Sequence, residues 1–153
     1  MNVTICAVGR LRSGPEQSLF DSYVERLPWT VRVHEIEIKG QADPQKKSIQ
    51  ETQAITGKIP PGAIVICLDS RGKSESSEKL AKRIAFWRDE GVRDIAIVIG
   101  GADGIDGSLI DNSDLVLSFG AVTWPHLLMR VLVAEQLYRS HCILTDHPYH
   151  RGH

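Results

Sequence analysis

The chain has 153 residues, enough for one compact domain and few for two. Its 42% apolar and 24% charged residues are typical of a soluble globular protein, and no apolar run approaches the ~18 residues of a membrane helix. A net charge of -1 excludes the overall positive charge that drives non-specific nucleic-acid binding. We therefore expect one domain over residues 1–153, without membrane partners.

Runs rich in Val and Ile alternate with helical patterns along the chain. Residues 1–10 lack the basic leader of a secretion signal, which indicates a first strand and a cytoplasmic protein. In order, we predict strand 3–8, helix 15–27, strand 31–38, helix 44–56, strand 63–69, helix 76–90, strand 95–100, short helix 108–112, strand 115–120 and helix 125–140. This alternation predicts an α/β fold with a mainly parallel sheet flanked by helices, and with strands 63–69 and 95–100 near its centre.

The last predicted helix is apolar nearly all round. Its segment LLMRVLVAEQLY is interrupted only by Arg130, Glu135 and Gln136. A helix apolar on all sides is buried on all sides, so we expect one face to meet a second subunit in a homodimer. The alternative is a central core helix within a monomer.

Three cysteines are widely spaced, at Cys6, Cys67 and Cys142. Two of them lie in apolar strand runs, so we interpret them as small core residues in a reducing cytoplasm. A catalytic cysteine is the alternative, because His141 stands beside Cys142.

Two predicted strands end in glycines. VIGGADGID places Gly100 and Gly101 after strand 95–100, but its GGxxG spacing differs from the dinucleotide fingerprint, and a plain tight turn is the alternative. SFGAVTWPH places Gly120 after the next strand, so the two loops can form one pocket whose backbone grips an adenine. We interpret Trp124 as a core residue, with a lid as the alternative.

The chain ends in HPYHRGH, residues 147–153. His147, His150 and His153 stand three apart and suggest a metal clip, but no carboxylate or cysteine cluster completes a closed site. We therefore expect no native metal. The separated histidines argue against a purification tag, although Gly152 and His153 alone fit a cloning remnant.

Three segments together carry a family resemblance: VIGGADG, LSFGAVTWPHLLMRVLVAEQLYR and HPYHR. They closely resemble the RlmH family of small SPOUT-class methyltransferases, and the match covers nearly the whole chain. The resemblance implies a SPOUT-type fold with a C-terminal trefoil knot, a homodimer, and S-adenosylmethionine as methyl donor for N3 of a pseudouridine in 23S rRNA. It places the donor at Leu68, Gly100, Gly101, Gly120, Ala121, Val122, Thr123, Trp124 and Pro125.

The same resemblance indicates residues for the base to be methylated. Arg139, His150 and Arg151 are candidate cations for the negative charge that develops on the base, Tyr149 for stacking or hydrogen bonding, and His126 for shaping the pocket. Some relatives have Pro-Glu at Ala102-Asp103, so Asp103 keeps the carboxylate one methylene shorter. No single general base is assigned.

A chain without net positive charge or a separate RNA-binding domain is expected to recognise a folded ribosomal surface, the large subunit or whole ribosome. Two other functions remain open. One is a non-catalytic ribosome-associated module with this fold, and the other is a histidine-tail metallohydrolase.

Overall fold

The computed structural model describes residues 1–151 and contains one five-stranded sheet. The strands are β1 (Asn2–Val8), β2 (Thr30–Ile36), β3 (Ile64–Ser74), β4 (Asp94–Ile99) and β5 (Leu115–Ser118). Their order is β2-β1-β4-β3-β5, and every neighbouring pair is parallel. The predicted parallel sheet is thus confirmed, with β3 and β4 in its interior.

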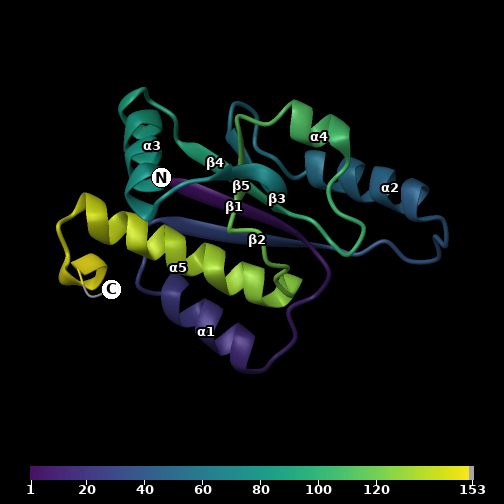
Figure 1. Ribbon diagram of the computed structural model, residues 1–153, viewed down its shortest axis with the longest axis horizontal. Coiled ribbons are helices and arrows are strands. Elements are labelled where there is room, and N and C mark those ends of the chain that lie inside the picture. Colours follow the sequence, from purple (N-terminus) through teal and green to yellow (C-terminus); the bar gives the residue numbers. More distant parts are fainter. Residues whose placement is uncertain (152–153) are drawn as a thin grey trace.

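Helices cover both faces of this sheet (Figure 1). On one face lie α1 (Pro15–Val24), α3 (Ser77–Asp89) and α5 (His126–Leu144), and on the other lie α2 (Pro44–Thr56) and α4 (Gly107–Asp111). A 3-10 turn, η1 (Pro148–Arg151), follows α5 and packs against it. The predicted α/β class is confirmed.

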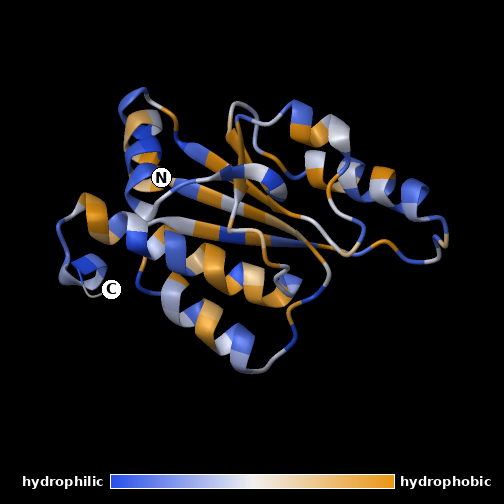
Figure 2. Cartoon of the chain, viewed as in Figure 1, coloured by the Kyte–Doolittle hydropathy of each residue, from blue (hydrophilic) through white to orange (hydrophobic). Residues whose placement is uncertain are grey.

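Each interior strand sends alternate side chains into two separate cores, as the two-residue period of a strand requires. Ile5, Ile97 and Leu68 face the larger core under α1, α3 and α5. Cys6, Cys67 and Val98 face the smaller core under α2 and α4. Figure 2 shows the resulting hydrophobic strands between helices of mixed hydropathy.

The cysteines behave as core residues. All three are free and buried. Burial raises the pKa of the Cys6 and Cys67 thiols to about 11, so neither is a reactive thiolate at neutral pH. Cys142 is 1% exposed, which leaves the pair with His141 no open access to a substrate.

Most predicted boundaries lie within a few residues of the observed ones. The Ser76 hydroxyl caps α3 by accepting a hydrogen bond from the Lys79 N–H, and Gly91 follows the helix with a φ of 87°. Two elements are longer than predicted. Helix α5 continues to Leu144, and β3 continues to Ser74.

The extension of β3 depends on a glycine. Its pairing with β5 shifts register between Leu68 and Lys73, and Gly72 lies in this irregular part. A Cβ at Gly72 would come within 2.6 Å of the Val116 backbone, so only glycine allows the two strands to pack this closely. The apolar run ends at Leu68, so no sequence pattern indicates the extension. The trefoil knot implied by the resemblance stays a prediction.

Candidate active site

A cavity of about 590 Å³ lies at the carboxyl edge of the sheet, beside Leu68 to Ser70 of β3 and the ends of β4 and β5. This edge is where parallel α/β sheets bind ligands, and the volume suits a nucleoside-sized molecule. It is lined by all nine residues predicted to hold the methyl donor: Leu68, Gly100, Gly101, Gly120, Ala121, Val122, Thr123, Trp124 and Pro125. His126 lines it as well.

The first glycine loop is both a tight turn and a wall of the cavity. The Gly104 N–H donates to the Gly101 carbonyl at 3.0 Å and closes the turn. A Cβ on Gly100 would lie 2.8 Å from the Ile105 side chain, and one on Gly101 would lie 2.7 Å from that of Val8. The glycines therefore permit close packing behind the loop and leave its backbone bare toward the cavity.

The second glycine loop follows β5. Gly120 has a φ of 101°, and a Cβ built on it would meet no atom within 4 Å, so open space adjoins this backbone. The Ser118 hydroxyl holds the loop, because it accepts from the Gly120 N–H at 3.3 Å and donates to the Gly120 carbonyl at 3.1 Å. The loop presents backbone amides and carbonyls at a fixed geometry, as recognition of a heterocycle needs.

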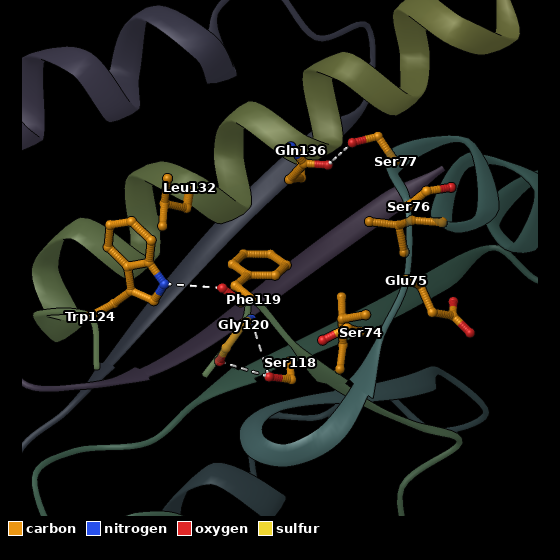
Figure 3. A pocket seen from close by; sticks show the side chains of 12 residues that line it. Ser74, Glu75, Ser76, Ser77, Ser118, Phe119, Gly120, Trp124, Leu132 and Gln136 are labelled. Atoms are coloured by element: carbon orange, nitrogen blue, oxygen red, sulfur yellow. Dashed lines mark hydrogen bonds between the residues drawn. The ribbon is translucent and has the colours of Figure 1, made fainter. Parts of the chain in front are cut away.

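Trp124 corrects one prediction. The residue is 39% exposed and therefore not a core residue. Its indole N–H donates to the Phe119 carbonyl at 3.1 Å, which fixes the ring across the loop (Figure 3). The ring lines both the cavity of about 590 Å³ and a neighbouring cavity of about 390 Å³, which runs between α5 and the start of α3.

Sequence reasoning missed several lining residues. Asp69 and Ser70 follow Leu68, and Met129 lies one turn into α5. The hydrogen bond from Arg71 lowers the pKa of Asp69, so this carboxylate is ionised beside the cavity at neutral pH. Its position in the sequence could have revealed Asp69, because it is the first polar residue after the apolar run of β3.

The tail residues gather elsewhere, at the far end of α5. The Tyr149 hydroxyl donates to Glu135 Oε1 at 3.0 Å and can accept from the Tyr23 hydroxyl, whose oxygen lies 3.3 Å away. Arg139 forms an ion pair with the same Glu135 oxygen at 2.6 Å and lies 4.9 Å from the Tyr149 ring centre. Burial and these hydrogen bonds raise the pKa of Tyr149, so its phenol stays protonated and able to donate.

Of the predicted base-recognition residues, the structure thus brings Arg139 and Tyr149 together. It also adds Tyr23, which no sequence pattern singled out, and Glu135, which was noted in the sequence only as an interruption of an apolar helix. Within the tail, His150 Nδ1 lies 2.5 Å from the His147 carbonyl oxygen, and exposed Arg151 pairs with Asp146 at 2.6 Å. Gly152 and His153 lie outside the described residues.

The tail and the glycine loops contact α5 at different positions. The helix begins at His126 beside the loops, whereas Tyr149 folds back onto Glu135, nine residues or about 14 Å further along at 1.5 Å per residue. His126 is at the cavity, whereas Arg139, Tyr149, His150 and Arg151 are not among its lining residues. Asp103 is exposed at the tip of the Gly101–Gly104 turn and does not line the cavity either. A single subunit does not unite the two groups.

Two further findings concern the described part of the chain. Between residues 1 and 151, no three His, Cys, Asp or Glu side chains are grouped so that they could hold a metal ion. In the same stretch, no helix combines the length and apolar character that crossing a membrane requires. His153, the third histidine of the suggested metal clip, is outside this range.

The chain is similar to known methyltransferases over nearly its whole length. The family model described as "Predicted SPOUT methyltransferase" matches residues 1–150. The chain is 44% identical over 152 residues to a Rhodospirillum centenum protein and 47% identical over 152 residues to one from Paramagnetospirillum magneticum. It is 49% identical over 159 aligned positions to one from Ruegeria pomeroyi.

Each of these relatives is named "Ribosomal RNA large subunit methyltransferase H". The alignments cover 99% of this chain and 99% to 100% of each relative. The glycine loops and the cavity they line therefore lie wholly within the matched region, and the chain belongs to the SPOUT methyltransferase family.

Proposed function

We propose that this protein transfers a methyl group from S-adenosylmethionine to ribosomal RNA of the large subunit, at N3 of a pseudouridine in 23S rRNA. The observation that carries the proposal is the cavity lined by both glycine loops in a chain of the SPOUT methyltransferase family. The names of its full-length relatives supply the class of acceptor, and the RlmH resemblance supplies the pseudouridine and its N3 atom.

The donor fits the residues present. Backbone groups of Gly100, Gly101 and Gly120 would hold its adenine and ribose, and the open space beside Gly120 leaves room for them. Ionised Asp69 would favour a positively charged ligand at the same cavity. When bound, S-adenosylmethionine supplies an already activated methyl group, so the protein has to align it and handle one proton.

The protein's own side chains would serve the acceptor base. As the N3–H proton leaves, negative charge grows on the imide, and a nearby cation stabilises it. We assign this task to Arg139, His150 and Arg151. Tyr149 is hydrogen-bonded to Glu135 and Tyr23, so it would seat the tail and present its ring edge to the base. His126 would shape the donor end, and Asp103 would face the approaching RNA.

A homodimer would unite the two groups, which do not share the cavity within one subunit. Apolar side chains remain uncovered near the start of α5, where Val122 is 65% exposed and Leu128 39%. Leu132 lies one turn further along, in the cavity of Figure 3. We propose that a second copy covers this surface and brings its tail to the donor loops.

The substrate would be an assembled particle. With a net charge of -1, the protein lacks the general attraction that free RNA binding uses, so shape would select the site. The large subunit or the whole ribosome offers such a folded surface. We also propose that the whole chain is one domain working in the cytoplasm.

The direct test is transfer of labelled methyl groups from S-adenosylmethionine to ribosomes that lack this modification. The proposal predicts one methyl per large subunit, located at the pseudouridine by digestion and mass spectrometry. Folded protein that binds ribosomes without transferring label would instead be a non-catalytic module. Stoichiometric zinc or manganese in untagged protein, together with hydrolase activity, would favour the metallohydrolase.

A further inference from the structure

We infer that Arg130, together with Glu35, is a positioning residue for the methyl-donor site, holding the end of β1 against the first glycine loop and His126. The inference rests on the donor site proposed above. Arg130 was noted in the sequence only as an interruption of an apolar helix, and the proposed mechanism does not use it.

Arg130 is the largest fully buried side chain in the described part of the protein, with 1% of its surface exposed. Its guanidinium joins three segments. One terminal nitrogen donates to Glu35 Oε1 on β2 at 2.7 Å, and the other donates to the Gly9 carbonyl at 2.6 Å and the Val8 carbonyl at 3.4 Å. Glu35 Oε1 also accepts from the Leu11 N–H at 2.6 Å. The fork therefore fixes the whole turn that leaves β1.

The same turn is in contact with the donor site. A Cβ on Gly101 would lie 2.7 Å from Val8, so the glycine loop rests directly on the Val8 side chain. A Cβ on Gly9 would lie 3.5 Å from His126 Nε2, so the imidazole packs over this glycine. Movement of Val8 and Gly9 would thus displace both the donor loop and His126.

The stability of the fold does not by itself explain why an arginine is buried at position 130. Its Nε is buried and has no hydrogen-bond partner among residues 1–151. An unpaired buried donor is costly, and buried ion pairs are often matched or exceeded in stability by apolar residues of similar size. Arginine does offer a planar fork able to bind two carbonyls and a carboxylate at once, which lysine does not. This geometry is what a positioning role requires.

The test compares Arg130→Met, Arg130→Lys and Glu35→Gln by three measurements. These are the affinity for S-adenosylmethionine by calorimetry, the KM for the donor against kcat in methyl transfer, and the amide resonances of Gly100 and Gly101. Arg130→Met should weaken donor binding about ten-fold or more and shift both resonances, because small misplacements of a binding loop are costly. Arg130→Lys should recover part of the affinity, and Glu35→Gln should show a smaller loss, mainly in KM.

Ile84→Ala is the matched control, since Ile84 is equally buried but belongs to α3. It should lower the melting temperature while leaving donor affinity and the two glycine resonances unchanged. Folded Arg130→Met with wild-type affinity and resonances would overturn the inference. If Arg130→Met does not fold, Glu35→Gln decides, and unchanged affinity and resonances there would overturn it too. Wild-type protein that binds no donor would refute the proposed function, whereas the glycine resonances would still report on positioning.

Discussion

Replacing Tyr149 by phenylalanine removes one oxygen atom and tests whether the tail must be seated on α5. The hydroxyl donates to Glu135 Oε1 at 3.0 Å and can accept from the Tyr23 hydroxyl at 3.3 Å, and phenylalanine loses both hydrogen bonds. The ring would keep its place, because Tyr138 lies 4.8 Å from it and Arg139 4.9 Å. The change therefore isolates the anchoring bonds from the shape of the tail.

The magnitude follows from the partners. A hydrogen bond to a charged group contributes about 1.5–3 kcal/mol, and the lower end applies here because Tyr149 is only half-buried. A loss of about 1–2 kcal/mol in seating the tail corresponds to a roughly 5- to 30-fold lower methyl-transfer rate. The melting temperature should change little, since η1 is a single terminal turn. Donor affinity should stay the same, because the glycine loops lie at the other end of α5.

Initial rates of label transfer to unmodified ribosomes, with calorimetry for the donor, measure these effects. Tyr23→Phe is the matched control, because it leaves the bond from Tyr149 to Glu135 in place and should cost less. An unchanged transfer rate in Tyr149→Phe would refute the anchoring role. An equal loss of donor affinity would refute the separation of the two sites.

Three other predictions concern the dimer surface, the buried thiols and the first glycine loop. Leu132→Asp should yield folded monomers in sedimentation, because Leu132 is only half-buried, whereas Leu137→Asp should unfold the protein, because a charge in the core costs about 3 kcal/mol or more. Burial raises the pKa of Cys6 and Cys67 from 9.0 to about 11, so the unfolded chain loses these protons first. Denaturant titrations should then show stability falling between pH 9 and 11, by about 3 kcal/mol per thiol, and less in the Cys6→Ala, Cys67→Ala double variant. Gly101→Val should abolish donor binding in calorimetry. It should also lower stability by about 1–3 kcal/mol, because the valine side chain would overlap Val8 of β1. Donor binding at the wild-type level would contradict the placement of the donor loop.

The sequence predicted the sheet, and the meeting of the two glycine loops at one cavity, for a physical reason. Buried parallel strands read as continuous apolar runs, and the residues that follow them meet at one edge, so Gly100 and Gly120 could be placed in one pocket without coordinates. Trp124 was wrongly predicted to be a core residue, because an aromatic side chain just before a helix is buried only if neighbouring side chains pack over it. Here its N–H finds the Phe119 carbonyl at the surface.

Long-range polar contacts were out of reach. The hydrogen bonds of Arg130 span 95 to 122 residues of sequence, and that between Tyr149 and Tyr23 spans 126. No local pattern encodes such pairs, because they depend on how α1, β2 and α5 pack in the finished fold. The position of the tail was equally invisible, because Tyr149 folds back onto Glu135 after α5 ends at Leu144, four residues beyond the predicted end at residue 140.

The central claim is that donor loops of one subunit and the tail of its partner form one methylating site. Two inactive variants test it: deletion of residues 147–153, which should leave donor binding intact, and Ala121→Trp, which fills the cavity from an exposed position without disturbing the core. Each should fail to methylate ribosomes alone. When they are mixed and subunit exchange is verified with two labels, heterodimers should regain activity through the one site that combines an intact cavity with an intact tail. Confirmed heterodimers without activity, or full activity of the tail deletion alone, would contradict the account.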